Sequence, residues 1–579
     1  MPGARFKNKT LVDILRQSRD LYGQKTCMKA FRGDRFIDIS YLEFAQTAFD
    51  LARGLLSLGL KPEDKVALLS ENRPEWGASY LATLAAGGIN VPLDALLKIS
   101  GWSHILRESE SRFLVVSQNF LPEIEQISDD IPDLEFLICM DRPPSGSSAI
   151  YFDDLEAKGS QYGGELVRPE VDDLAAIIYT SGTTGQSKGV MLTHENIVVD
   201  IDGILQMIDI EENDNFISVL PIHHTFECTC GFLVPIAGGA CITYARGLAS
   251  KLIVEDIKNN NATIILGVPL LFEKMHDGLM KAISKKPPLT RAIFKTTYGL
   301  SNALNSILKI KAGSMIFKGL REKAGLSSLR LMVAGGAAMP PEVAKVFNLL
   351  GFTFLQGYGL TESSPVLTFN PPDRRKDDSI GIPIPAAEMK IVNPDSRGIG
   401  EIFARGPMVM KGYYNNEAAT NEVLMDGWLH TGDIGWVDNE GYYYITGRLK
   451  NVIVTSGGKN VYPEEIEYEL GKSPYILESL VLGFPTGAKR GEEIQAIVVP
   501  DYEYFDILAE ESGKSFTSDE IEAIIKKEVA DMCAHLASYK RVKYVQLREE
   551  EFEKTSTKKI KRFLFTQKPE LINNRGNDK

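Results

Sequence analysis

The feature that most constrains the fold is an alternation of helical and strand patterns near the start of the chain. Residues 42–58 and 75–88 carry apolar side chains at helical spacing, whereas residues 64–70 and 88–94 are short apolar runs rich in β-forming residues. Strands that alternate with helices build parallel sheets covered by helices. Further apolar runs of strand length are LAAIIYTS, NFISVLP and ATIILGVP. We therefore predict an α/β fold with several layers.

The length of the chain, 579 residues, is too great for one hydrophobic core, so at least two domains are expected. From Gly398 onward, glycines separate short strand patterns, and one such strand ends at Gly447, before a run of charged residues. We place a domain boundary there. The prediction is a large multi-layer N-terminal α/β domain at residues 1–449 and a small α+β C-terminal domain at residues 450–579.

The overall charge excludes one class of function. A formal net charge of −13 is unsuited to nucleic-acid binding, which needs a basic face. It also means that an anionic ligand must be held by local donors and cations, because the field of the whole protein repels it.

Cysteine spacing and apolar runs bear on location. The six cysteines match neither a zinc-ligand pattern nor a secreted disulfide framework, and we predict that Cys228 and Cys230 are buried thiols. The N-terminal residues lack the apolar run of a signal peptide. The longest apolar region, residues 216–244, is interrupted by two histidines and a glutamate, so we predict no membrane span. A cytoplasmic location is the resulting expectation.

The composition changes at residues 276–328, which we define as the basic segment. Ten lysines and arginines but only two acids lie between His276 and Gly325. Apolar residues recur at helical spacing in residues 301–320. Two interpretations stay open: a solvated helix pair with a basic outer face, and a basic amphipathic surface that meets an anionic membrane.

A loop rich in glycine and hydroxyl groups, YTSGTTGQSKG at residues 179–189, lies between two apolar strand patterns. Glycines let the backbone approach a ligand, and the hydroxyl and N–H groups form an anion-binding nest to which Lys188 adds a positive charge. The loop is not a Walker A motif, because Lys188 is followed by Gly189 and not by Ser or Thr, and GxGxxG is absent. We predict a phosphate-binding loop in preference to a flexible surface turn.

This loop and four further motifs resemble one enzyme family. YTSGTTGQSKGV resembles the phosphate loop of the AMP-forming acyl-CoA synthetases, which belong to the adenylate-forming superfamily with luciferases and peptide-synthetase adenylation domains. Five motifs in the family's order over about residues 10–565 make a chance match negligible. The long-chain fatty acid–CoA ligases are the most similar members. The other four motifs are QGYGLTE at residues 356–362 for adenine and magnesium, WLHTGD at 428–433 for ribose, GRLK at 447–450 for the hinge, and KTSTKKIKR at 554–562 for the catalytic lysine.

The resemblance implies where ATP and Mg²⁺ bind. Mg²⁺ prefers one or two carboxylates with phosphate oxygens and water, and the family's ligand corresponds to Glu362, with Thr184 as a second metal-binding residue. In this assignment the ring of Tyr358 stacks on adenine, and Asp433 accepts hydrogen bonds from the ribose hydroxyls. Close packing of a strand on a helix is the alternative for GGAA at residues 335–338. The implied ATP-binding residues are Thr180, Ser181, Gly182, Thr183, Thr184, Gly185, Lys188, Gly336, Ala337, Gln356, Gly357, Tyr358, Gly359, Thr361, Asp433 and Arg448.

The resemblance also implies that the small C-terminal domain is mobile and carries a catalytic lysine. In the first pose the ammonium of Lys559 bridges the substrate carboxylate and the α-phosphate, and acyl-AMP and pyrophosphate form. Many family members have glycine before this lysine, so Lys558 is the alternative for the group that reaches the phosphate. Lys450 corresponds to the hinge. In the second pose Gly457 and Gly458 leave room for the pantetheine arm of CoA, and a plain β-turn is the alternative for these glycines.

The acyl site is predicted at LPIHHTFE, residues 220–227. His224 occupies the position of the family's usual histidine and joins Lys559 and Glu362 as a catalytic candidate. Its imidazole would contact the carboxylate or gate the acyl tunnel, and a buried core histidine is the alternative. Adenylation domains for amino acids usually place an aspartate in their pocket. LPIHHTFE has none, so we predict an acid without an α-amine.

Together these implications predict a reaction and its partners. A fatty acid is activated by ATP as an acyl-adenylate and passed to CoA, which gives acyl-CoA, AMP and pyrophosphate. The basic segment resembles an insertion of long-chain members, so a long-chain fatty acid–CoA ligase is predicted. The alternatives are transfer to an acyl carrier protein, which the basic helices could dock, and a non-catalytic membrane-surface protein. Peripheral contact with the inner membrane surface would accompany a cytoplasmic location.

Overall fold

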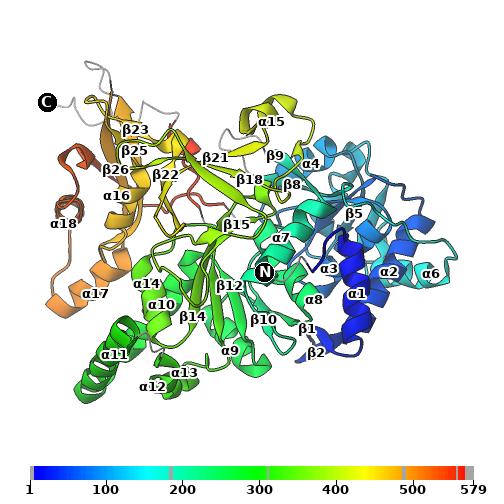
Figure 1. Cartoon of the computed structure of the whole chain (residues 1–579), viewed down its shortest axis with the longest axis horizontal. Helices are drawn as coiled ribbons and strands as arrows, with labels where there is room; N and C mark the ends of the chain where they lie inside the picture. Colours follow the sequence, from blue (N-terminus) through cyan, green and yellow to red (C-terminus); the bar gives the residue numbers. More distant parts are fainter. Residues whose placement is uncertain (1–4, 181–186, 309–311, 486–490, 556–558, 567–579) are drawn as a thin grey trace. The chain divides into compact units, whose positions relative to one another are not determined.

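The computed structural model describes residues 5–180, 187–308, 312–485, 491–555 and 559–566 (Figure 1). These form two compact units. Unit 1 consists of the described residues of Met1–Thr180, Ser187–Met389 and Ala404–Leu429, and unit 2 of those of Lys390–Phe403 and His430–Lys579. The units are defined by internal contacts, and the domain boundary at 449/450 stays a prediction.

The first large sheet of unit 1 has nine strands. Its central strands are parallel, and antiparallel strands close both edges. Strands β10 to β13 are buried along their whole length, as expected for parallel strands covered on both faces. In sheet order the strands are β16 (Ile382–Pro383), β15 (Val366–Phe369), β14 (Thr353–Gly359), β13 (Leu331–Ala334), β12 (Ile264–Gly267), β10 (Asn215–Ser218), β11 (Cys241–Tyr244), β1 (Thr26–Arg32) and β2 (Arg35–Ser40).

The second large sheet of unit 1 has eight strands. It is parallel from β8 to β7, whereas β9 runs antiparallel to β8 and β19 antiparallel to β9. The predicted strands at 64–70 and 88–94 correspond to β3 and β4. In sheet order the strands are β19 (Gly412–Tyr413), β9 (Lys188–Thr193), β8 (Leu174–Thr180), β4 (Ile89–Pro92), β3 (Lys65–Leu69), β5 (Ser111–Val116), β6 (Phe136–Cys139) and β7 (Ile150–Tyr151).

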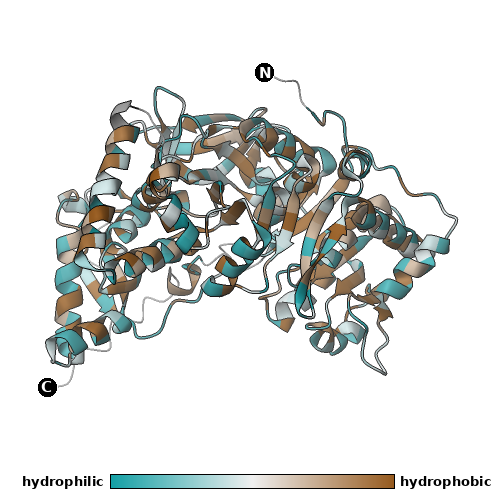
Figure 2. Cartoon of the chain, turned by 90° about the horizontal axis from the view of Figure 1, so that it is seen from below, coloured by the Kyte–Doolittle hydropathy of each residue, from teal (hydrophilic) through white to brown (hydrophobic). Residues whose placement is uncertain are grey.

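Helices surround these sheets, and local sequence explains where several begin. Ser40 and Glu43 form a capping box at the start of α2, where each side chain accepts a hydrogen bond from the other residue's backbone N–H. Many helices carry both polar and apolar residues (Figure 2). The helices of unit 1 are α1 (Leu11–Tyr22), α2 (Tyr41–Ser57), α3 (Pro74–Ala85), α4 (Ile99–Glu108), α5 (Leu121–Glu125), α6 (Phe152–Gln161), α7 (His194–Met207), α8 (Val234–Gly238), α9 (Ser250–Asn260), α10 (Pro269–Ser284), α11 (Pro288–Leu308), α12 (Gly313–Ile316), α13 (Lys318–Lys323), α14 (Pro341–Leu349) and α15 (Glu417–Val423).

Unit 2 has its own hydrophobic core, between a small sheet and two helices. A three-stranded sheet of β25 (Ile476–Pro485), β26 (Glu492–Pro500) and β27 (Tyr544–Leu547) packs its apolar side chains against those of α16 (Pro463–Leu470) and α18 (Ser518–Met532). Strands β21 (Trp428–Val437) and β22 (Tyr443–Arg448) form an antiparallel pair. The remaining elements here are β17 (Glu388–Val392), β18 (Gly400–Arg405), β23 (Ile453–Val454), β24 (Asn460–Val461), α17 (Tyr502–Ser512) and α19 (Phe563–Thr566).

Two further expectations are met by the structure. All six cysteines are buried free thiols, Cys228 and Cys230 among them. The basic segment is helical over most of its described length, in α10 to α13. Among the described residues, no helix has both the length and the apolar character that crossing a bilayer requires.

Candidate active site

The ends of the predicted phosphate loop are held by a strand ladder. Thr180 on β8 pairs with Lys188 on β9, and the Thr180 hydroxyl donates a hydrogen bond to the Lys188 carbonyl oxygen at 3.5 Å. At Gly189, an added Cβ would lie 2.8 Å from Cγ2 of Ile177, so the close packing there favours glycine. The ladder places Thr180, the last residue of β8, beside Lys188, the first residue of β9. The predicted residues Ser181, Gly182, Thr183, Thr184 and Gly185 lie outside the described residues.

Lys188 and Glu362, which the motifs assign to phosphate and metal, are joined by a tyrosine that sequence reasoning missed. The short strand β19 pairs with β9 and places Tyr413 opposite Val190. The Lys188 ammonium lies 4.9 Å from the centre of the Tyr413 ring, and the Tyr413 hydroxyl donates a hydrogen bond to Oε1 of Glu362 at 2.8 Å. The backbone N–H of Met410 donates to the Glu362 carbonyl oxygen at 2.9 Å. A cation and a carboxylate therefore flank one buried phenol.

The Glu362 carboxylate fits a Mg²⁺ ion in its donor chemistry. A carboxylate offers two oxygens and about four acceptor positions, and the bond from Tyr413 uses one of these on Oε1. Oxygen ligands are those that Mg²⁺ prefers. Thr361 and Glu362 begin the short 3-10 helix η3 (Thr361–Ser363), which follows β14 directly.

The predicted adenine-binding residues meet at one edge of the nine-stranded sheet. Strands β13 and β14 are parallel, with Ala334 opposite Gln356, so the segments that follow both strands emerge at the same edge. Ligands of open α/β sheets bind at this carboxyl edge. Gly336 has φ of +83° and is exposed, as is Ala337. At Gly335 an added Cβ would lie 2.9 Å from the Phe226 ring, which supports the close-packing interpretation for that glycine.

The end of β14 is packed closely against neighbouring backbone. At Gly359 an added Cβ would lie 1.7 Å from the carbonyl oxygen of Pro365, a clash that glycine avoids. The side-chain amide of Gln356 donates to the Asp377 carbonyl oxygen at 2.6 Å, so this amide is used within the fold. Tyr358 is half-buried, and Gly357 pairs with Phe369.

In unit 2, the predicted ribose ligand Asp433 is oriented by an arginine opposite it on the ladder. Asp433 on β21 pairs with Arg448 on β22, and Nε of Arg448 lies 2.6 Å from Oδ1 of Asp433. The Asp433 side chain is 7% exposed. The Thr431 hydroxyl accepts the Asp433 N–H at 3.1 Å and donates to the Ile402 carbonyl oxygen at 2.6 Å. These contacts hold Asp433 of the ribose motif against Arg448 of the hinge motif.

The predicted hinge and catalytic lysines of unit 2 share one electrostatic neighbourhood. Lys450 follows β22 in a short 3-10 turn. Loss of hydration and the neighbouring cations, which include Arg448 and Lys559, lower the pKa of Lys450 to about 8. An opposing contribution comes from Asp433. The region is therefore rich in positive charge and suited to an anionic group.

The catalytic-lysine loop is anchored to unit 2. The Thr555 N–H donates to the Lys559 carbonyl oxygen at 2.8 Å, and the Lys559 N–H donates to the Thr555 hydroxyl at 3.2 Å. Arg562 donates to the Val481 carbonyl oxygen at 2.9 Å and pairs with Glu467. Lys559 itself is exposed. The described part of this loop is thus held against the fold of unit 2, and Lys558 lies outside the described residues.

Gly457 and Gly458, predicted to admit CoA, lie in the turn between β23 and β24. The Gly458 N–H donates to the Thr455 carbonyl oxygen at 2.8 Å, and Gly458 has φ of +68°. Both glycines are exposed, and an added Cβ at Gly458 would meet no atom within 4 Å. The turn interpretation describes their conformation, and the CoA role stays a prediction.

The predicted acyl-site loop carries a histidine pair beside an aspartate from β4's end. The rings of His223 and His224 lie 4.1 Å apart between centres, and Nε2 of His223 lies 3.4 Å from Oδ1 of Asp94. His223 is buried and His224 half-buried, so the core-histidine alternative describes His223 better than His224. Ligand atoms of all three lie within 4.8 Å of one another, a donor set that could also hold a transition metal. Sequence reasoning missed Asp94.

The last residue of this loop carries a buried carboxyl group. Glu227 is 1% exposed in the π-helix η2 (Phe226–Leu233), and Ser218 donates a hydrogen bond to its Oε1 at 2.5 Å. Burial raises the pKa of Glu227 to about 8, against the opposing effect of the Ser218 bond. At Gly231, an added Cβ would lie 2.6 Å from the Glu227 carboxyl carbon, so glycine makes room for it. Glu227 is therefore mainly neutral near pH 7.

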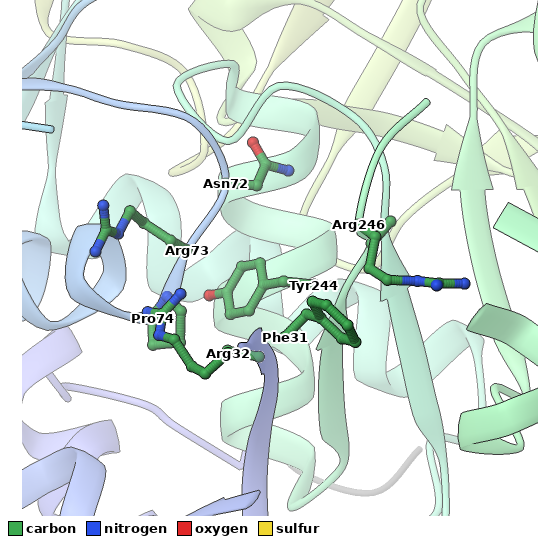
Figure 3. A pocket seen from close by; sticks show the side chains of 9 residues that line it. Phe31, Arg32, Asn72, Arg73, Pro74, Tyr244 and Arg246 are labelled. Carbon is green, nitrogen blue, oxygen red and sulfur yellow. The ribbon is translucent and has the colours of Figure 1, made fainter. Parts of the chain in front are cut away.

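A small cavity of about 200 Å³ lies elsewhere in unit 1, at the ends of β1 and β11 (Figure 3). No residue that the motifs assign to the site lines it. Its arginines are paired with acids: Arg73 with Asp141, and Arg246 with Asp256. Asn72 also lines the cavity, and its amide donates to the Leu220 carbonyl oxygen at 2.5 Å. The cavity wall thus supports the loop that leads to the histidine pair.

The bond between Tyr413 and Glu362 gives a testable prediction. Tyr413→Phe removes a hydrogen bond to a charged carboxylate, and we expect KM for MgATP to rise roughly tenfold. Steady-state pyrophosphate release measures this effect. The matched control is Tyr414→Phe, because Tyr414 adjoins Tyr413 and has no hydroxyl bond to Glu362. Equal KM values in the wild type and Tyr413→Phe would show that this bond does not position the metal ligand.

The glycine-rich strand end and phosphate-loop motif of unit 1, with the aspartate and lysine loop of unit 2, define the adenylate-forming class of enzymes. Residues 15–414 match the AMP-binding enzyme family, and the chain belongs to that family. The family resemblance drawn from the five motifs is thereby confirmed.

Similar proteins support the same class. The long-chain-fatty-acid–[acyl-carrier-protein] ligase AEE15 of Arabidopsis thaliana is 28% identical, over 87% of this chain and 78% of its own length. The long-chain-fatty-acid–CoA ligase ACSBG1 of Rattus norvegicus is 30% identical, over 82% and 69%. The crystal structure of ATP-bound MatB from Rhodopseudomonas palustris is 26% identical, covers 96% of this chain and 98% of that chain, and has a TM-score of 0.74. The predicted fold, a large α/β N-terminal domain with a smaller C-terminal domain, is confirmed.

Proposed function

We propose that this protein is a long-chain fatty acid–CoA ligase that works through an acyl-adenylate. One structural observation carries the choice of an acid without an amine. Burial raises the pKa of Glu227 to about 8, so this carboxyl group of the predicted acyl-site loop is mainly neutral near pH 7. Such a loop offers little to the ammonium of an amino acid, whereas it suits a fatty acid. The two relatives named for long-chain fatty acids support the chain length.

The first half-reaction needs charge stabilisation at the α-phosphate. Substrate carboxylate and phosphate are both anionic, so their approach must be screened. In our proposal the phosphate loop and Lys188 hold the phosphates, Asp433 holds the ribose, and the ammonium of Lys559 bridges carboxylate and α-phosphate. Mg²⁺ held by Glu362, when bound, would neutralise part of the phosphate charge. Pyrophosphate then leaves.

The second half-reaction passes the acyl group to a thiol. We propose that Lys450 acts as the hinge for this step and that the turn at Gly457 and Gly458 admits the pantetheine arm of CoA. An acyl carrier protein bears the same pantetheine thiol and is the second candidate acceptor. The 28% identity to a long-chain acyl-carrier-protein ligase over most of this chain favours testing it.

The experiment uses the full-length protein with MgATP and a series of fatty acids from short to long. An aryl acid and an α-amino acid are included as comparison substrates. CoA and holo acyl carrier protein are supplied separately, and mass spectrometry measures the thioester.

A CoA thioester that is most abundant with long chains is the expected result. A thioester found only on the carrier protein would show that the carrier, and not CoA, is the acceptor. Preference for the aryl acid or the amino acid would overturn the fatty-acid assignment while leaving adenylation in place.

A further inference from the structure

Among its described residues, helix α11 packs on the core of unit 1 through the face that carries Phe294 and Tyr298. The rings of Phe294 and Tyr298 are partly buried against the core, and the Phe294 ring centre lies 5.8 Å from that of Phe317. One turn further, the buried Ser301 hydroxyl donates to the Leu349 carbonyl oxygen at 2.8 Å. The spacing of Phe294, Tyr298 and Ser301 places them on one side of the helix. In Figure 1, α11 lies at the margin of unit 1 beside α12 and α13.

The opposite side of α11 presents large apolar side chains to solvent. Leu289 is 72% exposed, Ile293 55% and Leu300 52%. At about 100° per residue these three fall within about 40° of one another around the helix. We call them the outer stripe of α11. Single exposed leucines are common, but a stripe of this kind on an anchored helix marks a surface that meets a partner.

Positive charge is concentrated in the segment that carries the outer stripe. Residues 278–321 contain nine lysines and arginines and no acid, in a chain whose net charge is −13. Arg291 and Lys295 on α11 are exposed, as are Lys285 and Lys286 just before it. Long basic side chains keep their charges in water while their stems lie along apolar surface. This combination of cations and an apolar stripe matches a helix that lies in a membrane interface.

We propose that α11 docks on an anionic lipid bilayer, with the outer stripe among the upper acyl chains and the exposed cations of the same segment at the phosphate headgroups. A bilayer offers negative charge and an apolar layer in one plane, which suits both features at once. An acidic carrier protein would satisfy the cations but leaves three large apolar side chains without an apolar layer to enter. Docking would bring an acid that partitions into lipid close to the enzyme.

The test measures binding of the full-length protein to vesicles by flotation, without substrate. The two vesicle preparations are phosphatidylcholine alone and phosphatidylcholine mixed with phosphatidylglycerol. The wild type is expected to bind the mixed vesicles more tightly. Each lysine or arginine near an anionic surface contributes about fivefold to partitioning. The variant Lys285→Gln/Lys286→Gln/Arg291→Gln/Lys295→Gln is therefore expected to lose at least about 100-fold.

The apolar contribution is tested by Leu289→Ser/Ile293→Ser/Leu300→Ser, which we expect to bind mixed vesicles at least about tenfold more weakly. The matched control is Leu21→Ser/Leu248→Ser, since these leucines are 60% and 70% exposed elsewhere in unit 1. The control should bind like the wild type. Equal ATP–pyrophosphate exchange with a short, soluble fatty acid and equal Tm values would show that all variants fold.

Three results would overturn the proposal. They are a wild type that binds neither vesicle, variants that bind as tightly as the wild type, and binding to holo acyl carrier protein through the same residues without vesicle binding. The last result would reassign the surface to a carrier. Because the assay contains no substrate, its failure is distinguishable from failure of the proposed ligase activity.

Discussion

Lys559→Ala is expected to slow acyl-adenylate formation by a factor on the order of 10²–10³ while ATP still binds. The ammonium stabilises charge that develops between carboxylate and α-phosphate, so its removal acts on the transition state more than on the bound nucleotide. The side chain of Lys559 is exposed, and the bonds with Thr555 that hold this position use its backbone. The variant should therefore fold normally.

Pyrophosphate release in single-turnover experiments measures the adenylation rate, and titration calorimetry measures ATP binding. Lys558→Ala is the matched control, since it removes a lysine from the adjoining position. We expect this control to adenylate within about threefold of the wild type, a change of under about 1 kcal/mol in the barrier. Adenylation that is unchanged in Lys559→Ala but lost in Lys558→Ala would transfer the catalytic role to Lys558.

Glu227→Gln is expected to abolish part of the pH dependence of stability. Burial raises the pKa of Glu227 to about 8 in the folded protein, whereas in the unfolded chain it returns to about 4.5. Between about pH 4.5 and pH 8, Glu227 is protonated in the folded state and ionised in the unfolded state. The free energy of unfolding therefore falls as pH rises through this range. The loss is about 1.4 kcal/mol per pH unit and on the order of 5 kcal/mol in total. The contribution is fully present below pH 4.5.

In Glu227→Gln the amide oxygen can accept the Ser218 hydrogen bond at every pH. The wild type should therefore lose more in Tm than the variant between about pH 5 and pH 8, by several degrees. Asp200, whose pKa burial also raises, titrates in both proteins and cancels in the comparison. Parallel Tm curves for the two proteins would contradict a neutral, buried Glu227.

Local patterns in the sequence were sufficient for the elements and the class. The predicted helix at 42–58 is α2, Tyr41–Ser57, and the capping box of Ser40 and Glu43 explains its start. The three apolar runs of strand length became β8, β10 and β12. These patterns succeed because hydrophobic spacing and capping act over a few residues. The five motifs identified the adenylate-forming class since glycines and hydroxyls at fixed spacing serve a fixed ligand.

The contacts of the site residues could not be predicted in the same way. Tyr413 is 51 positions from Glu362 and belongs to a two-residue strand that exists only by pairing with β9. Asp94 follows β4 of the eight-stranded sheet, and His223 follows β10 of the nine-stranded sheet. Their contact therefore depends on how the two sheets pack within unit 1. The roles of the site residues stay predictions, and the phosphate loop from Ser181 to Gly185 lies outside the described residues.

The sequence by itself determined the α/β elements, the order of the motifs and the family, all of which depend on interactions between near neighbours in the chain. Only the tertiary structure decided that Glu227 is buried, that Tyr413 links Lys188 to Glu362, and that Leu289 and its stripe are exposed. Burial and distant contacts arise when sheets and helices pack, and packing joins residues whose separation in sequence carries no signal.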